Sequence, residues 1–135
     1  ALRSCIDLEK LGEKTITIDC DVIQADGGTR TASITGGYLA LELAIQKLLN
    51  DGKLTKNPLL SKVAAISVGR VNGQIMLDLD YDEDCSAEVD MNIVMNNKNE
   101  FIEIQGTGEE STFVYSELLE FIALSKNAFD YLFLL

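Results

Sequence analysis

Residues 26–31 place two glycines, two threonines and an arginine where an extended segment gives way to a helical pattern. Glycine lets backbone N–H groups approach an anion closely, and the first turn of a helix adds partial positive charge. Arg30 can hold a phosphate group through two parallel hydrogen bonds. The segment is therefore a candidate phosphate site. Because the Gly-Lys-Ser/Thr of a Walker A motif is missing, a glycine turn with a surface arginine is the alternative interpretation.

A second candidate is the acidic run 78–90, which holds seven carboxylates in thirteen residues and no base. Clustered carboxylates bind a hard cation such as Mg²⁺, or act as a general acid where like charges raise one pKa. An EF-hand loop is excluded, because Glu83 and Val89 stand where that loop needs glycine and glutamate. A solvated acidic loop is the alternative interpretation. Asp90 argues against that alternative, because it alternates with apolar neighbours on an expected strand.

Composition limits the remaining chemistry. The chain has no histidine, which excludes Ser-His, Cys-His and His-metal sites. Its formal charge of -11 disfavours a nucleic acid or an anionic membrane as partner on simple electrostatic grounds. Three widely spaced cysteines and no signal peptide indicate reduced thiols and a cytoplasmic location. The apolar run 129–135 is far below the ~20 residues needed to span a bilayer, so it is expected to be a buried helix end with no membrane partner.

The elements that must position these residues follow from periodicity and turn signals. At 135 residues the chain is expected to form a single domain around one core. Residues 1–8 resemble the tail of a helix that Gly12 ends, and residues 15–23 alternate as a strand should. A helix is expected from about residue 31 to residue 50, and the Gly36-Gly37 pair inside it indicates close approach of another backbone.

The second half of the chain is dominated by hairpin signals. Asn72-Gly73 accepts the positive φ angles of a type I′ turn, and it lies between the apolar runs 63–71 and 74–81. Residues 89–95 and 100–105 are expected as two further strands around a turn, followed by a loop over 106–112 and a helix over 116–132. This order predicts an α+β fold with helices stacked against an antiparallel or mixed sheet.

Long stretches of this sequence closely resemble ribonuclease PH. The similarity is carried by residues 17–36, residues 83–92 and residues 103–107, in the same order as in that family. It implies the ribosomal protein S5 domain 2-like fold and a phosphate-dependent 3′-to-5′ exoribonuclease. Such an enzyme trims the 3′ ends of transfer RNA precursors and other RNA, and transfers terminal nucleotides to inorganic phosphate to give nucleoside diphosphates.

The resemblance also assigns roles to residues of this chain. Gly28, Thr29 and Arg30 are expected to hold the attacking phosphate. Asp84 and Asp90 are expected to bind Mg²⁺ or to protonate the leaving 3′ oxygen. Asp82 and Glu88 are expected to lie behind these two carboxylates. The two candidate sites would then form a single site, in which a bound cation offsets charge on the scissile phosphate.

The resemblance covers only the later part of that family's chain. Residues 1–135 are expected to lack the N-terminal strands and the first, arginine-bearing helix, so the chain is expected to be a fragment that is inactive alone. The absent basic residues would account for the acidic charge. The family implies a hexamer built as a trimer of dimers. The alternatives are a non-catalytic RNA-binding or scaffold subunit of such a ring, and a metal-buffering or interaction module. Val114 replaces the usual Ser or Thr cap of the final helix.

Overall fold

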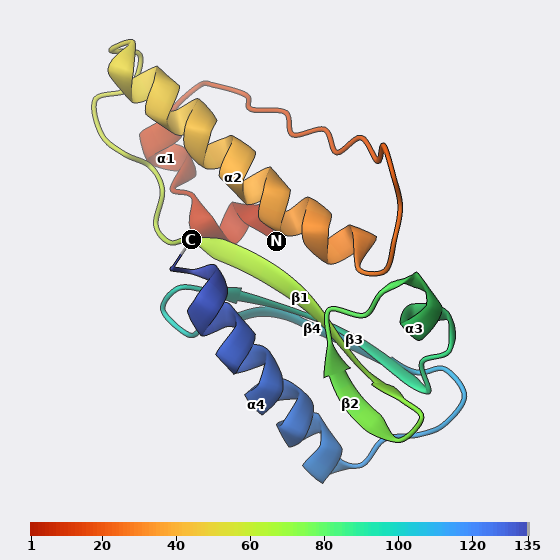
Figure 1. Ribbon diagram of the computed structural model, residues 1–135. Helices are drawn as coiled ribbons and strands as arrows, with labels where there is room; N and C mark the ends of the chain where they lie inside the picture. The colour runs from red at the N-terminus through yellow and green to blue at the C-terminus, as the bar shows by residue number, and fades with distance from the viewer. Residues whose placement is uncertain (135) are drawn as a thin grey trace.

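The computed structural model describes residues 1–134 and contains four α-helices and four strands. A short 3-10 helix, Leu2–Cys5, precedes them. Helices α2 and α4 are the long ones, and α1 and α3 are each little more than one turn (Figure 1). The elements in chain order are α1 (Leu8–Leu11), α2 (Thr29–Asn50), β1 (Val63–Val71), β2 (Gln74–Leu77), α3 (Tyr81–Cys85), β3 (Val89–Asn96), β4 (Phe101–Gly108) and α4 (Tyr115–Leu132).

The four strands form one antiparallel sheet in the order β2-β1-β3-β4, with α2 on one face and α4 on the other (Figure 1). Side chains alternate between faces along a strand, so β1 and β3 supply both layers. Val63, Ala65 and Val94 pack toward α2, whereas Val68 and Met91 pack toward α4. The predicted α+β arrangement of helices against a sheet is confirmed.

The predicted β-hairpin is confirmed, although its second strand is shorter than expected. Asn72 and Gly73 have φ angles of 49° and 74°, as a type I′ turn requires. Strand β2 ends at Leu77, because Asp78 has a φ of 55° and redirects the chain. Asp80 then caps α3 by accepting a hydrogen bond from the backbone N–H of Glu83 at 2.9 Å. The acidic run is therefore partly helical, which neither sequence interpretation anticipated.

The predicted strand over residues 15–23 is wrong. This segment runs extended along α2 without a partner strand in the described residues (Figure 1). Ile16 and Ile18 are half-buried against the α2-side core, which accounts for the alternation in the first half. Val22 remains 49% exposed. The alternation of apolar and polar residues indicates which side chains face a neighbouring element. It does not provide the second strand with which backbone hydrogen bonds would form.

Two expectations near the N-terminus are also corrected. The first helix is split at Asp7, whose carboxylate accepts hydrogen bonds from two backbone N–H groups and begins α1. Gly12 ends α1 with a φ of 72°, as predicted. Within residues 1–134, no other backbone atom lies within 4 Å of a Cβ placed on Gly36 or Gly37. A methyl group on Gly37 would meet only the side chains of Ile18 and Leu2, both at 3.4 Å.

The C-terminal third differs from prediction at its boundaries. Strand β4 continues to Gly108, three residues into the expected loop. Helix α4 begins at Tyr115, close to the predicted start. Phe129 is buried in the α4-side core but Leu134 is 84% exposed, so the apolar end of the chain is only partly buried. Leu135 lies outside the described residues. Over residues 1–134, every helix is too short or too polar to cross a membrane.

Candidate active site

A pocket of about 190 Å³ lies where the N-terminus of α2 meets α3 and the α2-facing side of β1 and β3. It is lined by the five residues that the resemblance assigns to phosphate, to Mg²⁺ or to the leaving 3′ oxygen. They come from three elements that are far apart in the sequence: Gly28, Thr29 and Arg30 at the start of α2, Asp84 in α3, and Asp90 in β3. Asp26, Ser67 and Asn92 complete the lining, and sequence reasoning did not single them out.

The glycine loop is held in place by α3. The Asp26 carboxylate accepts hydrogen bonds from the backbone N–H groups of Gly27 at 2.8 Å and Tyr81 at 2.6 Å. Gly27 is pressed against backbone, since an added Cβ would lie 1.9 Å from the carbonyl oxygen of Leu79. Gly28 precedes the first turn of α2 with a φ of 70°, a conformation that favours glycine. The N-terminus of α2 is thereby fixed at the pocket wall.

The two carboxylates at the opposite wall differ in their surroundings. Asp90 is half-buried in the central strand β3, where it pairs with Gly69 on one side and Thr107 on the other. Burial raises the pKa of Asp90, and the nearby carboxylates of Asp84 and Glu109 raise that pKa further. Asp84 is exposed on α3. Asp90 is thus the carboxylate that the fold favours in its protonated form.

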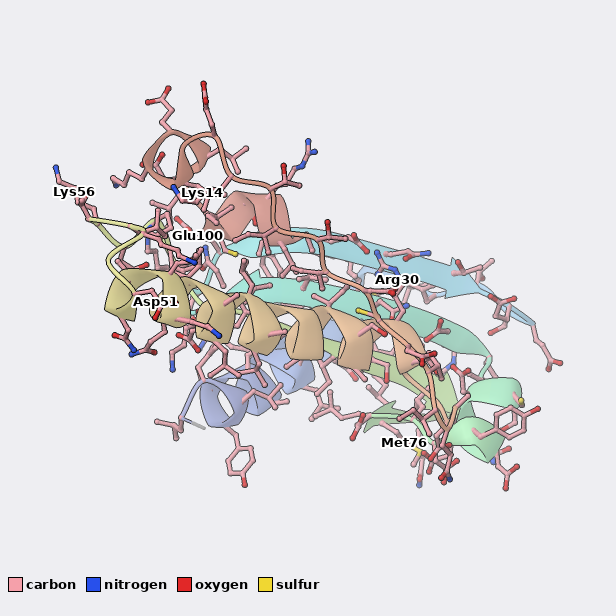
Figure 2. All side chains as sticks on the ribbon, turned by 90° about the horizontal axis from the view of Figure 1, so that it is seen from above. Lys14, Arg30, Asp51, Lys56, Met76 and Glu100 are labelled. Carbon is pink, nitrogen blue, oxygen red and sulfur yellow. The ribbon has the colours of Figure 1, made fainter. Side chains whose placement is uncertain are left out.

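Arg30 is held by an acidic partner that the sequence did not indicate. Its Nη2 donates to Oε2 of Glu103 in β4 at 2.9 Å, and its Nη1 lies 2.7 Å from Oε1. Figure 2 shows the Arg30 side chain reaching from the start of α2 toward the sheet. The guanidinium lowers the pKa of Glu103 by hydrogen bonding and by its charge. This end-on contact leaves the Nε–H edge of the guanidinium available to a ligand.

Asp82 and Glu88 do not line this pocket. The Glu88 carboxylate lies 2.7 Å from Nε of Arg70 in β1 and accepts a hydrogen bond from the backbone N–H of Gly73. Arg70 also contacts Glu117 in the first turn of α4. Glu88 therefore joins the hairpin turn to α4 on the side of the sheet away from the pocket.

The pocket can hold a metal ion only with help from non-protein ligands. In residues 1–134 no three histidine, cysteine, aspartate or glutamate side chains form a metal-binding group. Mg²⁺ is commonly bound by one or two carboxylates together with waters and substrate phosphates. Asp84 and Asp90 supply two such carboxylates at this pocket. This donor set fits Mg²⁺ and excludes a closed structural metal site.

A larger cavity of about 530 Å³ lies between the extended segment 18–24 and α2. It shares Asp26 and Thr29 with the smaller pocket. Its charged lining consists of carboxylates alone, at Asp19, Asp21 and Asp26, so it offers no cationic group to an anion. Size therefore does not identify the site here, and the smaller pocket carries the opposed charges that chemistry on a phosphate requires.

Comparisons with known proteins agree with this geometry. The model of the 3′ exoribonuclease family, domain 1, matches residues 1–45, and that of domain 2 matches residues 62–128. Ribonuclease PH of Exiguobacterium sibiricum is 53% identical over 130 residues, which are 96% of this chain and 52% of that protein. Ribonuclease PH of Crocosphaera subtropica is 56% identical over 126 residues, 93% of this chain and 52% of that protein.

The chain thus spans about half the length of the curated relatives it matches. The crystal structure of rice (Oryza sativa) Rrp46 is similar with a TM-score of 0.62 and 19% identity, over 82% of this chain and 46% of that one. That likeness supports the fold alone. Because both domain models of one family match and both relatives share more than half of the aligned residues, this chain belongs to the 3′ exoribonuclease family.

Proposed function

We propose that this chain carries the phosphate and carboxylate groups of a phosphate-dependent 3′-to-5′ exoribonuclease. The proposed substrates are the 3′ ends of transfer RNA precursors and other RNA, and the products are nucleoside diphosphates. The observation that supports this function is the single pocket shared by Arg30, Asp84 and Asp90. The ribonuclease PH relatives, at 53% and 56% identity, support the reaction type.

Each residue in the pocket suits one part of such a reaction. Inorganic phosphate would bind the Nε–H edge of Arg30 and the backbone at the α2 N-terminus, in position to attack the last phosphodiester. One phosphate oxygen forms a bond to the terminal phosphorus, and the bond from that phosphorus to the preceding 3′ oxygen breaks. The 3′ oxygen leaves with the bonding electrons and needs a proton. Asp90, whose pKa is raised, is suited to hold and deliver that proton.

The charges in the pocket support a role for Mg²⁺. Three carboxylates, Asp26, Asp84 and Asp90, line the pocket with one guanidinium. An RNA phosphodiester and an inorganic phosphate would add further negative charge, which one arginine does not offset. Asp84 would hold the ion, and Asp90 would join it as a ligand in its ionised form, after it has given up its proton; the bound ion supplies positive charge beside the scissile phosphate.

The alternative function is a non-catalytic RNA-binding or scaffold subunit of a ribonuclease PH-type ring. Such a subunit has no need for two carboxylates facing a phosphate-binding arginine, so the composition of the pocket favours the enzyme. We further propose that the active assembly is a hexamer, a trimer of dimers, located in the cytoplasm. Light scattering on a full-length polypeptide that contains these 135 residues tests the assembly, and a stable monomer at micromolar concentration would contradict it.

Phosphate dependence tests the function directly. A full-length polypeptide that contains this chain should shorten RNA from the 3′ end only with phosphate present, and should run in reverse with nucleoside diphosphates. Arg30→Ala should raise the phosphate KM by roughly 30-fold, since a lost bidentate contact removes about 2 kcal/mol of anion binding. Lys126→Ala is the matched control, because Lys126 also forms an exposed ion pair, with Asp130 on α4. Equal shortening in phosphate-free buffer would identify a hydrolase and contradict the proposal.

A further inference from the structure

Ser67 is a buried polar residue in the pocket wall to which neither the motif nor the resemblance assigned a role. It lies in the middle of β1 with 2% of its surface exposed, and its Oγ has no hydrogen-bond partner among residues 1–134. Buried hydroxyl groups are nearly always hydrogen-bonded, because a hydroxyl without a partner loses its interaction with water and gains nothing in return. The orphaned Oγ therefore indicates a group that a ligand completes.

The surroundings of Ser67 show which ligand that is. A Cβ placed on Gly28 would lie 3.3 Å from Ser67 Oγ, so the hydroxyl sits directly against the N-cap of α2. The Thr31 hydroxyl is equally close to that point, but it already donates to the carbonyl oxygen of Gly28 at 2.8 Å. Ser67 is thus the hydroxyl beside the helix N-terminus that is free to donate, and an anion is the ligand a helix N-terminus favours.

The backbone holds Ser67 in this place on both sides. Its carbonyl oxygen accepts a hydrogen bond from the backbone N–H of Asp78 at 2.8 Å, and its Cα is paired with Asn92 of β3. Strand β1 is the second strand of four and is bordered by β2 and β3. A donor on such a strand needs no rearrangement when a ligand arrives, so little conformational entropy is lost on binding.

We propose that Ser67 is a phosphate-specificity residue, whose hydroxyl donates a hydrogen bond to an oxygen of the inorganic phosphate held by Gly28, Thr29 and Arg30. This inference rests on the proposed function and adds a neutral donor from the sheet to those supplied by α2. It places the phosphate between helix and strand, and it makes the buried β1 face part of the recognition site.

The chain supplies a matched control in Ser125. Ser125 lies in α4, in the opposite layer, where it is fully buried and its Oγ also has no hydrogen-bond partner. It does not line the pocket. Ser67→Ala and Ser125→Ala therefore remove the same kind of group, one from β1 at the pocket and the other from α4 on the opposite side of the sheet.

The experiment compares these variants in a full-length polypeptide that contains the chain. We expect both variants to keep or raise Tm without phosphate, because each removes a buried hydroxyl that has no partner. Only Ser67→Ala should raise the phosphate KM, by roughly tenfold, because it removes one hydrogen bond to an anion. The KM for RNA should not change. Ser67→Ala should also reduce the rise in Tm that added phosphate produces, which is a readout independent of turnover.

An unchanged phosphate KM and an unchanged phosphate-dependent Tm shift in Ser67→Ala would overturn the inference. An equal loss in both serine variants would also overturn it, since the effect would then be structural. Should Ser67→Ala fail to fold, Ser67→Cys keeps the volume with a much weaker donor and should show the same rise in KM. If Arg30→Ala weakens phosphate use and Ser67→Ala does not, the inference fails and the proposed function stands. If wild-type turnover does not need phosphate, the proposed function fails.

Discussion

Gly27→Ala tests whether contact with α3 holds the phosphate loop in place. A side chain added at residue 27 would point at the backbone of Leu79 and Asp80, just before α3 begins. The added Cβ would lie 1.9 Å from the carbonyl oxygen of Leu79 and 2.7 Å from the carbonyl carbon and oxygen of Asp80. A carbon and a carbonyl oxygen normally stay roughly 3.3 Å apart, so the overlap exceeds 1 Å. Because the clashing atoms are backbone, no side-chain rotation relieves it.

The size of the effect follows from this geometry. Overpacking typically costs about 1–3 kcal/mol, and a backbone clash belongs at the upper end of that range. Relief requires the loop to move away from α3, which would break the hydrogen bond from the Tyr81 N–H to Asp26. Gly36→Ala is the control, since a Cβ there meets nothing within 4 Å. In mid-helix it should stabilise α2 by about 0.5–1 kcal/mol.

Thermal unfolding and phosphate kinetics together provide the assay. Gly27→Ala should lower Tm by roughly 5–12 °C, whereas Gly36→Ala should raise it by a few degrees. Because Gly28 and Arg30 move with the loop, Gly27→Ala should also raise the phosphate KM while the KM for RNA changes less. A Gly27→Ala protein with the Tm and phosphate KM of the wild type would refute the reasoning, since the loop would then not depend on its contact with α3.

Three further predictions concern the charges and the helix cap. Burial and neighbouring carboxylates raise the pKa of Asp90, so ionised Asp90 destabilises the fold. Wild-type stability should therefore rise as pH falls from neutral through that pKa, whereas Asp90→Asn should remove this rise, increase Tm at pH 7 and abolish turnover without loss of RNA binding. Glu103→Ala should raise the phosphate KM more than it lowers kcat, because Arg30 loses the carboxylate that orients it. Its effect on stability should stay below about 1 kcal/mol, since solvent screens this half-exposed pair. Val114→Thr should add about 1 kcal/mol, measured by denaturant unfolding, because Glu117 already accepts the Val114 N–H and a threonine hydroxyl completes the capping box.

The sequence predicted those elements whose conformation is determined by their own residues. Asn72-Gly73 determines its own turn, and the spacing of Tyr38, Leu41 and Ile45 determines which face of α2 is buried. The strand predicted over residues 15–23 was wrong, because a strand also needs a partner strand, which the segment itself does not supply. The predicted second hairpin strand was too long over residues 78–81, because Asp78 adopts a positive φ. Aspartate tolerates this conformation, but its presence in a sequence does not predict it.

The candidate site shows the same division. Arg30, Asp84 and Asp90 were found because their motifs are local, although a family resemblance was needed to assign their roles. Glu103 and Ser67 were missed, because their positions at the site follow from strand register. Val94 pairs with Glu103 and Asn92 pairs with Ser67, and only these pairings bring both residues to the α2 face of the sheet.

Hydrogen bonds and an ion pair explain why only some carboxylates of the acidic run 78–90 are left for chemistry. Asp80 and Glu83 cap α3 through each other's backbone N–H groups, and Asp26 joins the glycine loop to Tyr81. Glu88 is paired with Arg70 on the far side. The hydrogen bonds of Asp26, Asp80 and Glu83 hold α3 and the glycine loop at the pocket, whereas the ion pair of Glu88 lies on the other side of the sheet. Asp84 and Asp90 line it, and Asp90 is held in the sheet where burial raises its pKa. Asp80, Glu83 and Glu88 are thus structural, so substituting them should change Tm before it changes the chemistry.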